Sequence, residues 1–213
     1  MKLSGHNKVL VHQIFEAAEL IGFETRNKYE ILDEKLQRIG YAAEQEKGIF
    51  GFFMRQFLGH WRTFTVYFFD MQRQTVFVAK HPFRFFFQRL EVTDGRGSYI
   101  GALQQRFSIF SKKFDVLNRY NQVIMKMSSP IWRIWTFPFY NHGNEVARVE
   151  KKWSGVLSEA FTDKDKFLVN FGDKRLGEDL RQLILASSVF IDLQYFEKKG
   201  SGGGGGSLLN VFD

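Results

Sequence analysis

Cysteine is absent from this sequence, and proline is scarce, with three residues in a chain of 213. Without cysteine the chain forms no disulfide, uses no thiolate and carries no S-linked acyl group. Long hydrophobic runs are missing too. The most apolar stretch, Leu183–Ile191, is followed at once by Asp192, whereas a membrane-spanning helix needs about 20 apolar residues. Residues 1–4 lead into no apolar segment, so we expect no secretory signal, no transmembrane segment and a cytoplasmic location.

Sequence signatures of catalysis are missing as well. We find no nucleophile elbow, P-loop or zinc-binding motif. The glycine-rich segment Gly95–Gly101 is interpreted as a hairpin loop rather than a dinucleotide-binding fingerprint, because no helix follows it. The histidines show no metal-binding or catalytic spacing: His6, His12, His60, His81 and His142. We therefore expect no catalytic residues and a protein that is not an enzyme.

Aromatic residues are abundant, at 17% of the chain with 25 phenylalanines. The 44% hydrophobic and 25% charged content is typical of a soluble globular domain. The net charge of +7 favours either solubility or attraction to an anionic partner, which would be lipid headgroups or nucleic acid. Nucleic acid is the least favoured partner, because the basic residues are scattered and form no known reading motif.

The segment Leu180–Phe196 predicts a helix at the centre of the fold. Its apolar residues cover every side of a helical cylinder, which is typical of a helix enclosed by protein. A helix with side chains is about 10–12 Å across, so the enclosing sheet must be wider than a filled eight-stranded barrel. Once enclosed, Asp192 must be paired or hydrogen-bonded. The apolar residues expected inside are Leu183, Ile184, Leu185, Val189, Phe190 and Ile191.

Short β-rich runs separated by turn residues fill the rest of the chain. Asp94–Gly97 and Asn141–Asn144 have the Gly and Asn that hairpin loops require. The expected strands are Val9–His12, Arg26–Leu32, Gln37–Glu44, Trp61–Phe69, Gln74–Lys80, Phe85–Thr93, Ser98–Phe107, Lys112–Leu117, Gln122–Met127, Ile131–Phe139, Glu145–Trp153 and Lys166–Phe171.

These elements predict a mainly β (α+β) fold, a twelve-stranded closed β-barrel that encloses a hydrophobic C-terminal helix. We assign residues 1–199 to this barrel domain. Residues 200–207 form a flexible Gly/Ser linker, and residues 208–213 form a short apolar tail.

Three blocks of sequence resemble one family. The first is Phe23–Ile31 (FETRNKYEI) with Tyr41–Glu44 (YAAE), the second is Lys151–Phe167 (KKWSGVLSEAFTDKDKF) and the third is Phe190–Glu197 (FIDLQYFE). In order and wording they resemble the phospholipid scramblase family of the Tubby-like, LURP-one-related superfamily. The resemblance implies a Tubby C-terminal-like barrel threaded by a hydrophobic helix. It also implies association with the cytosolic face of membranes and calcium-activated, ATP-independent movement of phospholipids between leaflets.

The chain departs from the animal members of that family, which carry a proline-rich N-terminal extension and palmitoylated cysteine clusters. In place of the clusters it has His81–Phe87 and Ile131–Phe139, which combine aromatic residues with arginine. Such segments suit the lipid–water interface; the alternative is that the rings pack in the core or in a dimer interface. The candidate membrane-contact residues are Phe83, Arg84, Phe85, Phe86, Phe87, Trp132, Arg133, Trp135 and Phe137.

The resemblance also carries over a calcium segment, with Asp163, Asp165 and Asp173 as candidate ligands. The segment is not an EF-hand loop, because Leu168 stands where Gly is needed and Lys174 where a bidentate Glu belongs. The alternative is a turn whose carboxylates cap backbone N–H groups.

Arg148, Lys151 and Lys152 resemble a segment that doubles as a nuclear-import signal in animal relatives. They form either a solvated strand edge or a basic patch that contacts lipid headgroups. The leading interpretation is a scramblase-like protein that binds anionic membranes peripherally. The alternative is a non-enzymatic lipid- or protein-binding module without scramblase activity, and a homo-oligomer remains open.

Overall fold

The computed structural model describes residues 1–14, 25–45, 63–133, 135–152 and 166–196. These residues form twelve strands, one α-helix and one π-helical turn. The strands are β1 (Lys8–Ile14), β2 (Thr25–Leu32), β3 (Arg38–Gln45), β4 (Phe64–Phe69), β5 (Thr75–His81), β6 (Arg89–Asp94), β7 (Tyr99–Arg106), β8 (Ser111–Asn118), β9 (Val123–Pro130), β10 (Thr136–Asn141), β11 (Asn144–Lys152) and β12 (Lys166–Asn170). The helical elements are α2 (Glu178–Ile191) and η2 (Asp192–Phe196).

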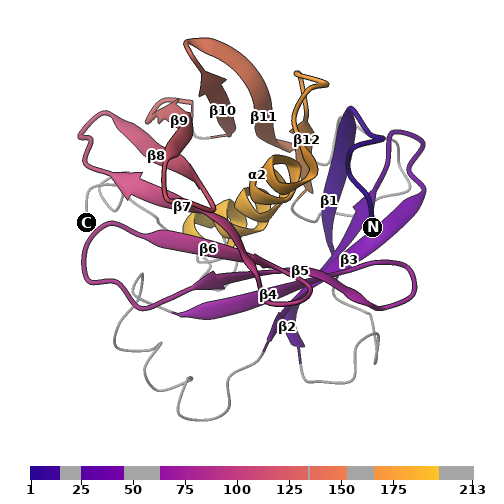
Figure 1. The fold of residues 1–213 in the computed structure, drawn as a ribbon. Helices are drawn as coiled ribbons and strands as arrows, with labels where there is room; N and C mark the ends of the chain where they lie inside the picture. Colours follow the sequence, from indigo (N-terminus) through magenta and orange to yellow (C-terminus); the bar gives the residue numbers. More distant parts are fainter. Residues whose placement is uncertain (15–24, 46–62, 134, 153–165, 197–213) are drawn as a thin grey trace, which may run out of the picture.

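The twelve strands close into one barrel (Figure 1). Each strand pairs with its neighbour in the sequence, and β1 pairs antiparallel with β12 to complete the ring. The closing pair runs from Lys8 opposite Asn170 to His12 opposite Lys166. Antiparallel neighbours are readily joined by short hairpins, which is why a turn-rich sequence produces this up-and-down order. The predicted closed barrel of twelve strands is confirmed.

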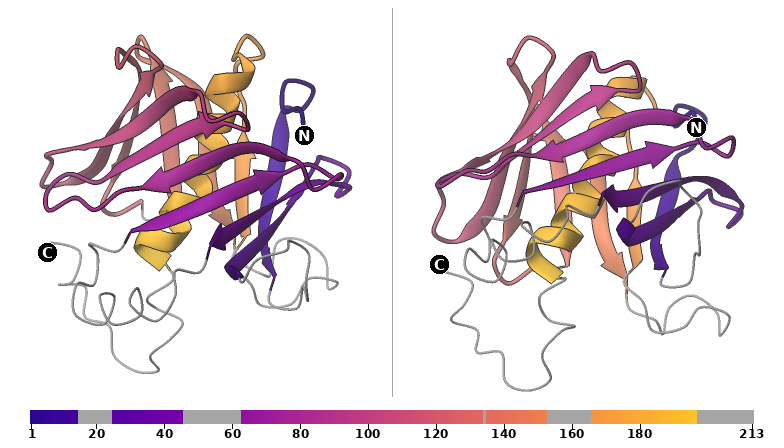
Figure 2. Two further views of the ribbon diagram at one scale, coloured as in Figure 1. Left: turned by 60° about the horizontal axis from the view of Figure 1, so that its bottom comes forward. Right: turned by 90° about the horizontal axis from the view of Figure 1, so that it is seen from below.

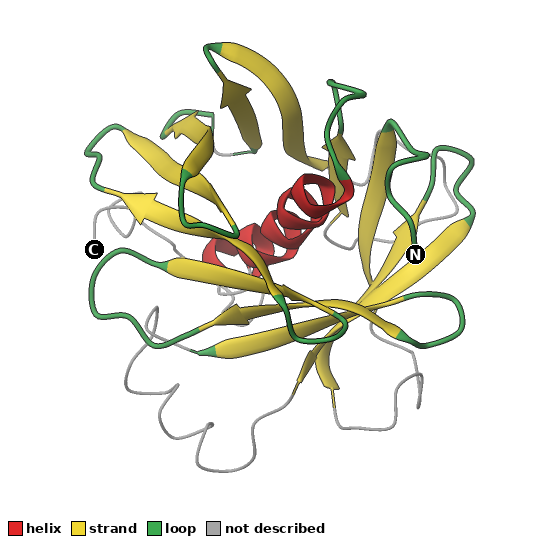
Figure 3. Cartoon of the chain, viewed as in Figure 1, coloured by secondary structure: helices red, strands yellow, loops and turns green. Residues whose placement is uncertain are grey.

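The helix α2 lies inside the barrel and is surrounded by the strands (Figures 2 and 3). Residues 181–191 are all buried. The ring of Phe190 has its centroid 6.2 Å from that of Phe64 in β4 and 5.7 Å from that of Phe114 in β8. The predicted central helix is confirmed, and Asp192 begins its π-helical end. Among the described residues, no helix has both the length and the apolar character that crossing a bilayer requires.

Turns of one design join the strands at the end of the barrel where α2 begins. In the β2–β3, β4–β5, β6–β7 and β8–β9 connections, one side-chain oxygen accepts hydrogen bonds from the backbone N–H groups two and four residues later. The third residue after it has a positive φ, which these turns require. The accepting residues are Asp33, Asp70, Asp94 and Asn118. The hairpin loops predicted at Asp94–Gly97 and Asn141–Asn144 are confirmed.

The N-terminal residues close this same end of the barrel. Arg181 is 1% exposed and donates to the carbonyl oxygens of Leu3 and His6 at 3.2 and 2.6 Å. Its buried charge is thereby met by polar partners. Glu178, in the first turn of α2, accepts hydrogen bonds from the backbone N–H groups of Leu3 and Ser4 at 2.8 and 2.9 Å. These contacts fix the start of the helix against the chain terminus.

Two strands begin later than the sequence indicated. The strand expected over Phe85–Thr93 begins only at Arg89, and the strand expected over Ile131–Phe139 begins at Thr136. Phenylalanine and tryptophan are common in strands, so an aromatic loop beside a strand has the composition of a strand. The structure instead places residues 82–88, 131–133 and 135 in connections between strands. The predicted linker at 200–207 and the tail at 208–213 lie outside the described residues.

Candidate membrane-binding site

Three loops follow one another around the end of the barrel where η2 ends. They join β5 to β6 (residues 82–88), β7 to β8 (residues 107–110) and β9 to β10 (described at residues 131–133 and 135). They are neighbours because β5 to β10 are consecutive in the barrel. Within the described residues, these loops carry eight of the twelve exposed large hydrophobic side chains. We call these eight the aromatic rim: Phe83, Phe85, Phe86, Phe87, Phe107, Ile109, Phe110 and Trp132.

The rim side chains are strongly exposed. Phe86, Phe107 and Trp132 are 72%, 76% and 73% exposed, one in each loop. Phe85 and Phe86 form an edge-to-face pair with their centroids 4.8 Å apart, so the rim contains contiguous apolar surface. Such a patch on a soluble domain usually marks a site that binds another protein or a membrane.

Positive charge accompanies the rim. Arg84 and Arg133 are exposed within the β5–β6 and β9–β10 loops, and Lys113 is exposed near the start of β8. The sequences of the three loops contain no acidic residue. Aromatic rings next to arginine and lysine are typical of protein segments that lie at the membrane–water interface.

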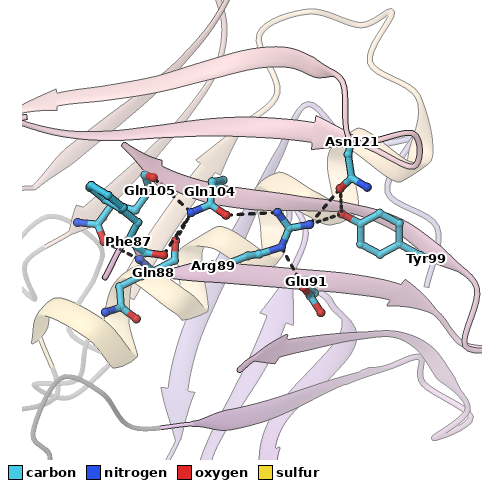
Figure 4. Close-up of polar contacts among 8 residues, drawn as sticks. All are labelled: Phe87, Gln88, Arg89, Glu91, Tyr99, Gln104, Gln105 and Asn121. Carbon is cyan, nitrogen blue, oxygen red and sulfur yellow. Dashed lines mark hydrogen bonds and ion pairs between the residues drawn. The ribbon is translucent and has the colours of Figure 1, made fainter. Parts of the chain in front are cut away.

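Polar contacts behind the rim hold the β5–β6 loop in place (Figure 4). The backbone N–H of Gln88 donates to the side-chain oxygen of Gln105, and the backbone N–H of Gln105 donates to the carbonyl of Gln88, both at 2.8 Å. The side-chain amide of Gln104 donates to the carbonyl of Phe87 at 3.2 Å. Phe87 has a φ of +50°, which is uncommon for a residue other than glycine. These bonds help to maintain that conformation.

Arg89 extends the polar network along the outer face of β6 and β7 (Figure 4). Its guanidinium donates to Glu91 at 2.9 Å and to Gln104 at 3.3 Å. It also donates to the Tyr99 hydroxyl and to Asn121, both at 3.0 Å. Burial raises the pKa of Tyr99 above its ordinary value, so its hydroxyl stays neutral. The network holds the side chain of Gln104 where it supports the loop.

His81 connects the loop to the barrel interior. It is fully buried, and its Nε2 lies 2.7 Å from the side-chain oxygen of Gln88. Its ring stacks on Phe64, with the centroids 4.8 Å apart, and lies 5.6 Å from the ring of Phe190 in α2. The base of the exposed loop is therefore anchored in the packed core.

Comparison with known proteins identifies the family. A model of the family described as Scramblase matches residues 1–198. The chain belongs to the scramblase family. It is 29% identical to human phospholipid scramblase 1 over 93% of this chain and 66% of that protein, and 29% identical to human phospholipid scramblase 2 over 92% and 69%. It thus spans about two thirds of the length of these relatives. A solved structure of an Arabidopsis thaliana protein aligns with a TM-score of 0.47 and 13% identity over 87% of this chain and 90% of the other.

In this scramblase-family barrel, two residues predicted to contact the membrane face the interior. Phe137 is 0% exposed, so the prediction for it is wrong. Trp135 is half-buried and stacks on Phe196, with the ring centroids 5.1 Å apart. The physical reason is that β10 begins only at Thr136, and Phe137 occupies a position of this strand that faces the barrel interior. The other seven candidates lie on exposed loops: Phe83, Arg84, Phe85, Phe86, Phe87, Trp132 and Arg133.

The predicted basic patch is divided between the two faces of β11. Arg148 and Lys152 both form ion pairs with Glu150, at 3.4 and 2.8 Å. Lys151 faces the interior, where its Nζ lies 3.9 Å from the ring centroid of Phe196. Side chains alternate along a strand, so these three residues do not form one surface. The prediction of a single patch is corrected accordingly.

Of the three predicted calcium ligands, Asp173 is the one that lies within the described residues. Asp163 and Asp165 lie outside the described residues. The backbone N–H of Asp173 donates to the carbonyl of Val146, near the start of β11, whereas β12 begins at Lys166, opposite the last residue of β11. Six residues of strand span about 20 Å. Asp173 therefore lies at the end of the barrel opposite to the start of β12.

Asp173 also has another partner. Its carboxylate accepts hydrogen bonds at 2.9 Å from both the side chain and the backbone N–H of Arg175, and these bonds lower the pKa of Asp173. This matches the alternative interpretation of a capped turn. Among the described residues, no three His, Asp or Glu side chains are grouped to hold a metal ion. Calcium binding by Asp163, Asp165 and Asp173 stays a prediction, and the contact with Arg175 makes Asp173 the weakest of the three candidates.

Sequence reasoning missed the β7–β8 loop. Its four residues, Phe107–Phe110, read Phe-Ser-Ile-Phe, and three of them belong to the aromatic rim. Connections between strands are normally polar, so three large apolar residues in four positions were an available signal. The expected strand Ser98–Phe107 included the first of them and concealed the pattern.

Proposed function

We propose that this scramblase-family protein binds peripherally to the cytoplasmic face of anionic phospholipid membranes, with the aromatic rim in the lipid–water interface. The observation that carries the proposal is the gathering of eight large apolar side chains on three neighbouring loops at one end of the barrel. The names of the relatives, phospholipid scramblases 1 and 2, support a phospholipid partner over a protein partner.

Rough magnitudes favour a reversible attachment. Full burial of a side chain such as Phe contributes about 1.5–3 kcal/mol, and side chains that enter only the interface contribute a fraction of that. A Lys or Arg close to an anionic surface adds about 1 kcal/mol, which makes Arg84 and Arg133 useful contacts. The chain has no cysteine to carry an acyl anchor. Binding should therefore depend on the rim and on the content of anionic lipid.

Co-sedimentation with vesicles tests the proposal. Wild-type protein is compared with Phe86→Ser/Trp132→Ser on vesicles of phosphatidylcholine with and without phosphatidylserine. Because 1.4 kcal/mol corresponds to a tenfold change, the double variant should bind at least about tenfold more weakly. The matched control is Tyr120→Ser, which removes a ring that is 75% exposed at the opposite end of the barrel and should bind like wild type.

Two results would oppose the proposal. The first is unchanged vesicle binding by the double variant. The second is a sedimentation-velocity result in which the wild type is a dimer and the double variant is a monomer. That result would show that the aromatic rim forms a contact between two copies of the chain.

The second candidate function is calcium-stimulated, ATP-independent movement of phospholipids between leaflets, which family membership favours. The barrel interior is filled by α2, whose residues 181–191 are buried, so a headgroup cannot pass through without displacing the helix. We place any lipid movement at the outer surface of the inserted loops. Dithionite quenching of labelled lipid in vesicles, with and without calcium, decides this point. Quenching limited to the outer leaflet, with binding intact, would leave a lipid-binding module without scramblase activity.

A further inference from the structure

The outer face of the β7–β8 hairpin carries two cations at directly opposite positions. Arg106 in β7 lies opposite Lys113 in β8, and both side chains are exposed. Phe114, the next residue of β8, packs against the central helix, so Lys113 and Asp115 on either side of it face outward. Arg106 faces outward with them, because its Nε–H donates to Asp115 Oδ2 at 2.6 Å.

Positive charge exceeds negative charge at this place. Asp115 is engaged by Arg106, and within the part of the chain that the structure describes the ammonium group of Lys113 forms no ion pair. Like charges directly opposite each other on two strands are destabilising. An anion bound beside the two cations would relieve the repulsion.

Two hydroxyl groups lie between these cations and the tip of the loop. Ser111 precedes Lys113 by two positions and therefore shares its face of β8. Its Oγ lies 2.8 Å from the Oγ of Ser108 in the β7–β8 loop. Each hydroxyl has one hydrogen to donate, and their mutual bond uses one of the two. The pair can thus donate one further hydrogen bond to an acceptor.

The same loop carries part of the aromatic rim. Ser108 lies in the sequence between Phe107 and the pair Ile109–Phe110, which are 76%, 56% and 67% exposed. Three residues of strand separate Phe110 from Lys113, or about 10 Å, and the long flexible stem of a lysine can cover much of that distance. When the rim enters the lipid–water interface, the hydroxyls and the ammonium group reach the level of the headgroups.

We propose that the outer face of this hairpin binds the phosphate of a phospholipid headgroup, through Lys113, Arg106 and the hydroxyl pair of Ser108 and Ser111. Hydrogen bonds from ammonium and guanidinium groups to phosphate are among the strongest in proteins. Asp115 uses only the Nε of Arg106, which leaves the two terminal nitrogens for the ligand. The acyl chains lie beside the rim residues of the loop, so the inference rests on the proposed membrane binding.

The experiment compares two exposed lysines on the same face of neighbouring strands. Lys113→Gln removes the proposed phosphate contact. The matched control is Lys126→Gln in β9, which removes the same charge opposite Asp115, two residues farther from the rim. Both variants are titrated with phosphatidylcholine vesicles that contain phosphatidylglycerol.

The Lys113 variant should bind at least about fivefold more weakly than wild type, because hydrogen bonds to charged groups are strong. The Lys126 variant should stay within about twofold, because an exposed charge away from the headgroups acts only through solvent. Equal losses in the two variants would show a general attraction to the surface charge. That result would overturn the headgroup site and leave the proposed membrane binding intact.

A measurement on the unmodified protein separates the site from the membrane. Dihexanoyl phosphatidylglycerol, kept below its critical micelle concentration, is added to protein labelled at the lysine side chains, and the NMR signals are followed. A saturable shift at Lys113 without one at Lys126 supports the site even if no vesicle binds. Inorganic phosphate should need at least about tenfold higher concentration, because it has no acyl chains to pack on the rim. No shift at Lys113, or equal affinity for the two ligands, overturns a lipid headgroup site.

Discussion

The hydroxyl of Tyr29 donates a hydrogen bond to Asp192 Oδ2 at 2.8 Å. Tyr29 belongs to β2, and Asp192 begins η2 at the end of the central helix. Both residues are 1% exposed, so the bond joins the barrel wall to the helix inside the core. It supplies the polar partner that burial of a carboxylate demands and that the sequence led us to expect for Asp192.

Removal of this donor should destabilise the barrel. In Tyr29→Phe a buried carboxylate loses a hydrogen bond, which typically costs about 1–3 kcal/mol. The control is Tyr41→Phe. The Tyr41 hydroxyl accepts a hydrogen bond from Arg38 at 3.3 Å on the exposed side of the barrel, and its removal should lower the free energy of unfolding by less than about 0.5 kcal/mol. Urea unfolding measures both. Equal losses of unfolding free energy in the two variants would show that the buried bond between Tyr29 and Asp192 contributes no more to stability than the exposed one.

Glu34 should contribute stability that disappears in acid. Burial opposes its ionisation, but hydrogen bonds from backbone N–H groups, including those of Lys8 and Asn7, and from His6 outweigh it and lower its pKa from 4.5 to about 2. A lowered pKa means that the contribution is full above pH 4.5 and fades as the pH falls towards 2. Glu34→Gln should therefore be less stable than wild type at pH 7, with a smaller difference at pH 3. A difference of the same size at both pH values would contradict this cause.

The support behind the rim should matter for binding. Gln104→Ala removes the amide that donates to the carbonyl of Phe87, so the β5–β6 loop must be ordered on the membrane. Ordering a side chain costs about 0.5–1.5 kcal/mol, which predicts vesicle binding weaker by about two- to tenfold with little change in melting temperature. Gln122→Ala, which loses an amide contact to Asn118 at the opposite end, is the control. An equal loss of vesicle binding in the two variants would show that the hydrogen bond from Gln104 to the β5–β6 loop has no specific role in binding.

Calcium binding should depend on Asp163 and Asp165 and not on Asp173. Titration calorimetry with millimolar calcium should give similar heats for wild type and Asp173→Asn, because Asp173 is already engaged by Arg175. Asp163→Asn/Asp165→Asn should give no heat. Loss of the signal in Asp173→Asn, or no heat with wild type, would refute the prediction.

The barrel could be predicted from the sequence because the features that specify it lie within short stretches of the chain. Turns such as Asp94–Gly97 lie between short β-rich runs, and the segment Leu180–Phe196 is apolar on all sides, which is typical of a helix enclosed by protein. The loops of the site could not be delimited in the same way. Aromatic residues favour strands, and only the pairing of β5 with β6, which extends from Phe77 opposite Asp94 to Lys80 opposite Glu91, shows where the loop lies.

The direction of single side chains also needed the structure. Lys151 and Lys152 are adjacent, and alternation separates them onto two faces, but the sequence does not show which one faces inward. The register does: Lys151 lies opposite Phe167, whose ring packs at 5.9 Å from that of Phe196. The inward direction of Lys151 is consequently visible only in three dimensions.

Spin-label depth measurement tests the end-on attachment most directly. Because the chain has no cysteine, Phe86→Cys and Tyr120→Cys each provide one labelling site, at positions that are 72% and 75% exposed at opposite ends of the barrel. On vesicles that contain phosphatidylserine, the label at position 86 should become accessible to oxygen and protected from a water-soluble nickel complex, while the label at position 120 stays in water. Equal exposure of both labels to the nickel complex on bound protein, or protection of position 120 instead, would contradict binding through the aromatic rim.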